Sequence, residues 1–176
     1  PIMILPMVWI RSGIAPVKEA WLGAALAVAG TAAICVQPTG VVVQNGAHDN
    51  TIGTDQINKR NVIGGHTFDG IRLEYSNDNI VIGNYTGTNL NGTAAIPNTR
   101  VGIMLYDADG NDIGMAGSGN LASGNGDDGI FLQSGSTGNT IVANMVGTTA
   151  DGVSALPNQD GGITLATGSS KNTVGG

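Results

Sequence analysis

The sequence is short of the residues that usually order a globular domain. Aromatic residues make up 4% of its 176 residues and charged residues 11%, whereas about 25% of a typical soluble domain is charged. A single cysteine, Cys35, is present, which excludes an intrachain disulfide and a zinc site made of cysteine pairs. Only seven Lys and Arg stand against 13 Asp and Glu, a net charge of -6. This balance excludes a nucleic acid backbone as the main partner, because it provides no basic surface.

Glycine and short apolar runs are what the chain has instead. Its 29 glycines predict many turns, while the steady supply of Ile, Val and Leu argues against disorder. A pattern of glycine, apolar residue, any residue and apolar residue recurs at intervals of 30, 32, 27 and 33 residues. The glycines of this pattern are Gly40, Gly70, Gly102, Gly129 and Gly162. Such a period indicates a repeat architecture.

A longer repeat is superimposed on the first. The octapeptides "NGTAAIPN" (91–98) and "DGVSALPN" (151–158) lie 60 positions apart, so the repeats alternate in pairs. We expect the two octapeptides to form the same corner of the fold on alternate coils. Pro97 and Pro157 would each end a strand there, because proline has no N–H to donate to a neighbouring strand.

An asparagine follows each repeated glycine by nine or ten residues and begins a short apolar run. These runs alternate with period 2, which is typical of strands. Strands too short to bury their own apolar face predict a stack of coils about 4.8 Å apart, with the asparagines hydrogen-bonded in a ladder at one turn. We therefore predict an all-β fold for residues 38–176, a right-handed parallel β-helix of about four to five coils. The ladder residues are Asn50, Asn79, Asn111, Asn139 and Asn172.

The segments "NTIGTDQINKRNVIGG" (50–65) and "GIRLEYSNDNIVIGNYTGT" (70–88) carry a resemblance to a known group. Residues 38–176 resemble the right-handed parallel β-helix repeats of bacterial secreted and surface proteins, the broad pectin-lyase-like group. The resemblance implies the fold. It leaves the function open among polysaccharide lyases, hydrolases, adhesins and inert stalks, because this fold carries all of them.

The first 37 residues differ in kind, and we expect an apolar helical segment there. Residues 20–36 contain no ionisable group except Cys35, and 17 largely apolar residues are at the lower limit of a membrane span. The stretch from residue 1 to 34 resembles the closing helix pair of EamA-like drug/metabolite transporters. A membrane anchor or export signal is an alternative, since Arg11 and Lys18 precede the apolar core. Two further alternatives for residues 1–37 are a helical cap over the end of the solenoid and a chimeric join.

Outward-facing strand positions are where a ligand would bind. Because strand side chains alternate, inward Ile71 and Leu73 leave Arg72 and Glu74 outside. The same register gives an outward column of Val42, Arg72, Met104, Phe131 and Thr164, and beside it Gln44, Glu74, Tyr106, Gln133 and Ala166. Aromatic rings among planar polar groups favour sugar binding, and ordinary β-favouring surface residues are the alternative. The candidate ligand residues are Arg72, Glu74, Tyr106, Phe131 and Gln133.

The carboxylates suggest two further kinds of site. "DADGND" (107–112) has the oxygen spacing of a calcium loop, so Asp107, Asp109 and Asp112 are candidate calcium ligands, although a plain turn is the alternative. Three more aspartates precede the repeated glycines and would stack into a row that binds a cation. These are Asp69, Asp128 and Asp160.

Catalysis needs particular groups on adjacent coils. If the chain is an enzyme, Glu74 and Asp107 would serve as the paired carboxylates of a hydrolase, and Arg72 as the base of a calcium-dependent lyase. Neither arrangement is a recognised motif, and no other cofactor is expected.

These observations favour a structural or adhesive module over an enzyme. We expect a fragment of a secreted or cell-surface protein that lies outside the cell and contacts polysaccharide or a surface glycan, with tethering to a membrane through residues 1–37 as one alternative. Its open ends would promote self-association. The alternatives are a polysaccharide lyase or glycoside hydrolase of the pectin-lyase-like fold, and the end fragment of a membrane transporter.

Overall fold

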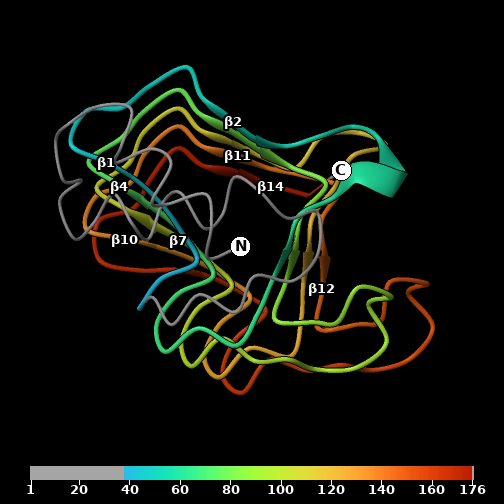
Figure 1. Ribbon diagram of the computed structural model, residues 1–176. Helices are drawn as coiled ribbons and strands as arrows, with labels where there is room; N and C mark the ends of the chain where they lie inside the picture. Colours follow the sequence, from blue (N-terminus) through green and yellow to red (C-terminus); the bar gives the residue numbers. More distant parts are fainter. Residues whose placement is uncertain (1–37, 176) are drawn as a thin grey trace, which may run out of the picture. The chain divides into compact units, whose positions relative to one another are not determined.

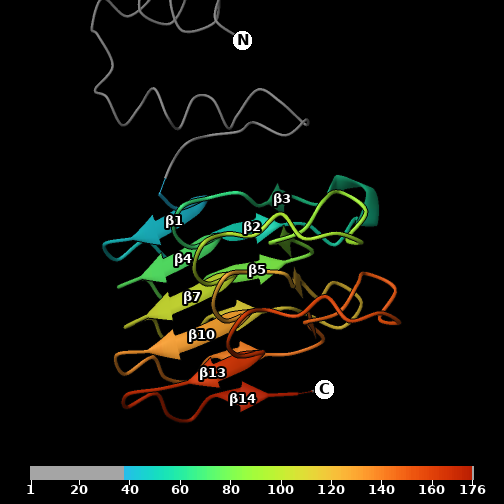
Figure 2. The same ribbon diagram turned by 90° about the horizontal axis from the view of Figure 1, so that it is seen from below.

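The repeat of about 30 residues folds into successive turns of a parallel β-solenoid. The computed structural model describes residues 38–175, which make about four turns. Every strand pairs in parallel with the equivalent strand of the next turn, so the strands form three sheets that run along the axis (Figures 1 and 2). The predicted all-β parallel solenoid is confirmed.

Sheet A is built from the glycine-led pattern that dominates the sequence. Its strands stack in chain order, one from each turn, as Figure 2 shows. They are β1 (Val41–Gln44), β4 (Ile71–Glu74), β7 (Ile103–Tyr106), β10 (Ile130–Gln133) and β13 (Ile163–Leu165). Each strand follows one of the five repeated glycines directly, which explains why that spacing equals the length of one turn.

Sheets B and C form the other two sides of the solenoid. Sheet B contains β2 (Thr51–Gly53), β5 (Ile80–Ile82), β8 (Asp112–Ile113), β11 (Thr140–Ile141) and β14 (Thr173–Val174). Sheet C contains β3 (Val62–Ile63), β6 (Tyr85–Thr86), β9 (Leu121–Ala122) and β12 (Met145–Val146). A short 3-10 helix, η1 (Ile57–Lys59), lies between β2 and β3. Strands of two to four residues cannot stand alone, so the stacking of turns supplies the stability.

The core is a column of aliphatic side chains inside the three sheets. In sheet A, Ile71 pairs in register with Ile103, and Leu73 with Leu105, and all four are fully buried. The alternation along each strand directs these side chains inward. The buried cluster consists of Ile63, Ile71, Leu73, Val81, Ile103, Leu105, Ala108, Ile113, Ala122, Ile130, Leu132 and Ile141.

Three asparagine ladders, one at each corner, tie the turns together. In the predicted ladder, Asn111 Nδ2 donates to Asn139 Oδ1 (3.1 Å), and Asn79 Nδ2 donates to Asn111 Oδ1 (3.2 Å). Backbone N–H groups add to it, since Asn111 N also donates to Asn139 Oδ1 (2.8 Å). The other two ladders were not predicted. They consist of Asn61, Asn84, Asn120 and Asn144, and of Asn98, Asn125 and Asn158.

The two octapeptides form hairpin loops between sheets C and A, on the second and fourth turns (Figure 1). Each loop closes with an antiparallel bridge, Thr88 to Ala95 and Thr148 to Ala155. The third turn has no such loop, which accounts for its 27 residues. Across it, Ala150 N donates to Gly92 O (2.9 Å), so the two loops contact each other. The expectation that both occupy the same corner on alternate coils is confirmed. The expectation that Pro97 and Pro157 each end a strand is wrong, because the preceding strands end at Thr86 and Val146 and only single bridges lie near the prolines.

The apolar helical segment expected at residues 1–37 lies outside the described residues. Within 38–175, no helix has the length and apolar character to cross a membrane.

Replacing a buried ladder residue should cost much more stability than replacing an exposed asparagine. Asn111 is fully buried. Its side-chain Nδ2 donates hydrogen bonds to Ser76 O, Asp109 O and Asn139 Oδ1. Asn111→Ala leaves several buried groups without partners, so we expect the free energy of unfolding in urea to fall by about 2–4 kcal/mol. The control, Asn91→Ala in an exposed loop, should change it by less than about 0.5 kcal/mol. Equal losses would contradict the structural role of the ladder.

Glycines where backbones of adjacent turns meet should be irreplaceable. Gly114 and Gly135 have nearly the same φ, 87° and 86°, but a Cβ on Gly114 would lie 2.0 Å from Val142 O, whereas Gly135 has open space around it. Gly135→Ala should therefore cost only the left-handed backbone strain, about 1–2 kcal/mol. Gly114→Ala should cost more than about 3 kcal/mol, because a turn must also shift. Thermal unfolding of both variants measures the difference, and similar melting temperatures would contradict the close approach.

Candidate functional site

The outer face of sheet A carries the residues predicted to bind a ligand. In register, Val42 lies beside Arg72, Arg72 beside Met104, and Met104 beside Phe131. The second column runs in the same way through Gln44, Glu74, Tyr106 and Gln133. Thr164 continues the first column, and Ala166 follows just beyond β13. The structure thus aligns both columns as the repeat predicted, while their role in binding stays a prediction.

Arg72 is the centre of a polar network on this face. Its Nη1 donates to Asp69 Oδ2 (2.9 Å) and its Nε to Glu74 Oε2 (3.0 Å). The Asp69 side chain is fully buried, so this pairing compensates for its lost hydration. Burial by itself lowers the pKa of Arg72, but the hydrogen bonds to Glu74 and Asp69 outweigh it and raise the pKa above its ordinary value. The guanidinium is therefore a fixed positive charge held in a fixed orientation.

Aromatic rings surround the Arg72 guanidinium. Its carbon lies 5.3 Å from the Tyr106 ring centroid and 5.7 Å from that of Phe68. Tyr75 meets Tyr106 edge to face, with centroids 5.6 Å apart, and Arg100 lies 4.4 Å above Phe68. Of the five aromatic residues between 38 and 175, only Tyr85 lies elsewhere, on sheet C.

Two side chains on this face are less exposed to solvent than the sequence predicted. Met104 faces outward by register, yet it is fully buried, lying between Arg72 and Phe131. Arg72 was expected to face solvent, but its side chain is only 14% exposed because it lies against its two carboxylate partners. Tyr75 is the most exposed aromatic residue here, at 49%, and Val42 and Gln44 at the first strand are also exposed.

The Tyr75 hydroxyl is a hydrogen-bond donor over a wide pH range. Its pKa is raised, first by the neighbouring Tyr106 and then by partial desolvation, with smaller contributions from Glu74 and Asp107. A phenol with a raised pKa keeps its proton in neutral and mildly alkaline solution. It can therefore donate to a ligand oxygen.

Glu74 and Asp107, the predicted catalytic pair, lie at the same end of sheet A. Asp107 comes one residue beyond Tyr106, the register partner of Glu74, and has a left-handed φ of 47°. The Glu74 carboxylate accepts the Arg72 Nε–H, so its charge is balanced within the strand. A catalytic role for the two carboxylates stays a prediction.

The predicted calcium ligands are spread over a corner of the solenoid. Asp109 Oδ1 accepts from Thr137 N (2.7 Å) and Thr137 Oγ1 (3.0 Å) on the next turn. Asp112 belongs to β8, and Asp107 lies at the end of sheet A. Asp109 thus joins two turns through hydrogen bonds, which is what the alternative to a calcium site, a structural turn, would need. Calcium binding stays a prediction.

A different group of carboxylates comes together in residues 38–175. One carboxylate oxygen from each of Asp127, Asp128 and Asp160 lies within 4.8 Å of the others. The predicted row does not form. Val101 lies between Asp69 and Asp128, because Gly70 N donates to Val101 O and Gly102 N donates to Asp128 O. Asp160 lies beside Asp127 rather than beside Asp128, as its N–H donates to Asp127 O. The extra Gly161 shifts it by one position. Asp128 is buried and accepts from Thr164 Oγ1 (2.6 Å).

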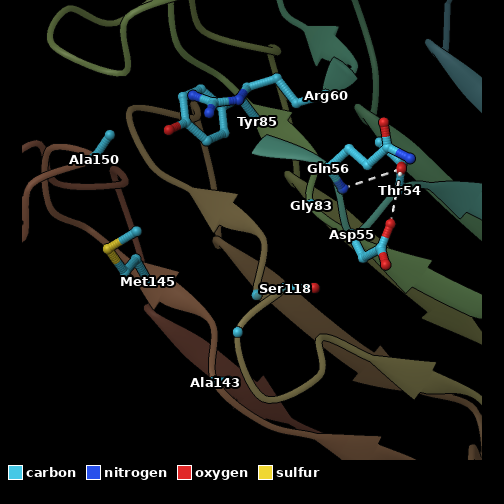
Figure 3. A pocket seen from close by; sticks show the side chains of 12 residues that line it. Thr54, Asp55, Gln56, Arg60, Gly83, Tyr85, Ser118, Ala143, Met145 and Ala150 are labelled. Atoms are coloured by element: carbon cyan, nitrogen blue, oxygen red, sulfur yellow. Dashed lines mark hydrogen bonds between the residues drawn. The ribbon is translucent and has the colours of Figure 1, made fainter. Parts of the chain in front are cut away.

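A cleft beside sheet C was not predicted. Its volume is about 350 Å³, and segments of four successive turns surround it (Figure 3). The polar side chains around it include Asp55, Gln56, Arg60 and Ser118, and Met145 is the largest apolar one. Its walls come from corner segments that differ from turn to turn, so no repeated sequence pattern marks it.

Comparisons with protein families, curated proteins and solved structures found no match to this chain. They therefore support neither the pectin-lyase-like nor the transporter resemblance, and the parallel β-solenoid is what the structure establishes.

Replacing Asp127 and replacing Asp151 with asparagine should change the stability at pH 7 in opposite directions. Partial burial, Asp128 and Asp160 raise the pKa of Asp127, so folding disfavours its charged form. Asp127→Asn should therefore stabilise the protein at pH 7, by less than about 1 kcal/mol because the group is partly solvated. This gain should vanish as the pH falls below about 3.9, where the carboxyl is protonated in both states.

Asp151 provides the matched control. The Thr149 hydroxyl and the Val153 N–H lower its pKa, so folding favours its charged form. Asp151→Asn should reduce stability at pH 7, and the difference should shrink as the pH falls through the lowered pKa. Urea unfolding of both variants at neutral and acidic pH measures these effects, and changes of the same sign would contradict the assignment.

Proposed function

We propose that this chain is part of a secreted or cell-surface β-solenoid protein whose described repeats act as a structural module that contacts polysaccharide. The contact surface is the outer face of sheet A, with Arg72, Glu74, Tyr106, Phe131 and Gln133. This placement outside the cell follows from the resemblance to pectin-lyase-like surface repeats, which is a fold-level analogy.

One observation carries the proposal, namely the gathering of aromatic residues on a single face. Four of the five aromatic residues between 38 and 175 lie on or beside sheet A, in a chain with 4% aromatics. Sugars offer an apolar ring face and a rim of hydroxyls, which suit aromatic rings among planar hydrogen-bonding groups. Tyr106, Gln133 and Glu74 supply this combination on adjacent strands.

The polysaccharide is proposed to be uncharged. The chain carries a net charge of -6, which repels polyanions over distances up to the Debye length, about 8 Å at physiological salt. The Arg72 charge is already balanced by Asp69 and Glu74. An acidic glycan would have to compete with both carboxylates for this guanidinium.

Loss of aromatic contacts should weaken glycan binding. Tyr106→Ala and Phe131→Ala should each reduce the affinity for a neutral soluble polysaccharide about threefold to tenfold, since a ring contact contributes about 0.5–1.5 kcal/mol. Affinity electrophoresis through gels containing xyloglucan or mixed-linkage β-glucan measures the effect. Val62→Ala, at a partly exposed position on sheet C, is the matched control and should migrate like the parent protein.

Two results would contradict this proposal. The first is migration of the parent protein that no neutral polysaccharide retards. The second is release of sugar products that Glu74→Gln abolishes, which would favour the lyase or hydrolase alternative instead. Melting temperatures of the variants are measured alongside, because Tyr106 also packs against Arg72.

A further inference from the structure

We propose that the cleft beside sheet C is a second binding site, one that takes a short neutral saccharide such as a disaccharide. It lies on a different sheet from the surface assigned above and depends on none of the same residues. The inference therefore goes beyond the proposed function and can hold or fail independently of it.

The cleft exists because its back wall is made of glycine and backbone. A Cβ on Gly83 would lie 2.1 Å from Thr54 O, and one on Gly119 would lie 1.7 Å from Ala143 O. Gly83 N donates to Ser118 O (3.0 Å), which joins two turns at this corner. The close approach of backbones therefore demands glycine at Gly83 and Gly119. Gly117 also lines the cleft, and a Cβ there would meet nothing within 4 Å, so the open space lies beside this third glycine.

Tyr85 and Met145 lie on the outer side of sheet C and border this hollow (Figure 3). The Arg60 guanidinium carbon lies 4.3 Å from the Tyr85 ring centroid, and Gly92 lies against the edge of the same ring. Tyr85 is consequently buried and held in place. Met145 is 36% exposed and offers an apolar surface to a ligand.

The insertion in the first turn supplies the polar wall. Residues 54–60, which include η1, bring Asp55, Gln56 and Arg60 to one side of the cleft. Gln56 N donates to Thr54 Oγ1 (3.1 Å), which fixes the start of this segment (Figure 3). The Ser118 hydroxyl adds a polar group from the third turn.

These groups together indicate the chemistry of the ligand. Met145, Ala143 and Ala150 are apolar, while Asp55, Gln56, Arg60 and Ser118 are polar. The formal charges of Asp55 and Arg60 cancel, so the lining favours an uncharged ligand with one apolar side and a hydroxyl rim. A pyranose ring has this form. The volume of about 350 Å³ is near the lower end of small-molecule sites, about 300–1,000 Å³.

Residue-resolved NMR of the isotope-labelled full chain tests the proposal. Cellobiose and N,N′-diacetylchitobiose are the neutral probes, and digalacturonate is the acidic one. A neutral probe should shift the backbone amides of Gly83, Ser118 and Ala143. Gln56→Ala and Met145→Ala should each weaken this binding about threefold to tenfold, through a lost hydrogen bond and a lost apolar contact.

Matched variants separate this site from sheet A. Gln159→Ala and Val153→Ala, at exposed positions outside the cleft, should leave the shifts unchanged. Tyr106→Ala should also leave them unchanged, even if it abolishes polysaccharide retention. The proposal is overturned if neither neutral probe shifts the cleft amides, if cleft and control variants bind alike, or if digalacturonate binds there more tightly than both neutral probes.

Discussion

The hydrogen bond from one asparagine side chain to the next is the interaction on which the rest of this solenoid depends. A buried amide costs free energy unless both its oxygen and its nitrogen are paired. Stacking identical amides satisfies both groups at once, because Asn79 donates to Asn111 and Asn111 donates to Asn139. The bond forms only when equivalent corners align, so it specifies the register as well as adding stability. With few aromatic residues available, three such ladders replace much of the packing of a larger core.

The ladders also explain how a chain of this composition can present functional surfaces. With the corners held in register, any outward position becomes a column parallel to the axis, as the alignment of Arg72, Met104 and Phe131 shows. Variation is then free at outward positions and in corner insertions. The aromatic face of sheet A results from variation at outward positions. The cleft beside sheet C results from a corner insertion at residues 54–60.

The sequence was sufficient to predict the features that repeat. The glycine spacing predicted the register of sheet A, and one asparagine spacing predicted one ladder. The ladder of Asn98, Asn125 and Asn158 could also have been found from the sequence, because each of these residues stands four positions before a repeated glycine and keeps the intervals of 27 and 33 residues. The ladder that begins at Asn61 was missed because insertions vary its intervals. Asn61 and Asn84 are 23 residues apart, whereas Asn84 and Asn120 are 36 apart. The burial of Met104, the shift caused by Gly161 and the cleft were missed because each depends on side-chain packing or backbone approach between turns, which no period records.

Amide hydrogen exchange is the measurement that tests the role of the ladders most directly. The backbone N–H of Asn111 donates to Asn139 Oδ1 in a buried corner, whereas that of Thr93 donates to Asn89 Oδ1 in an exposed loop. Both bonds have the same donor and acceptor types and differ in burial and stacking. The Asn111 amide should exchange only through global unfolding, and the Thr93 amide through local opening that is faster by orders of magnitude. Equal exchange rates for the two amides would contradict the view that the asparagine ladders hold the solenoid together.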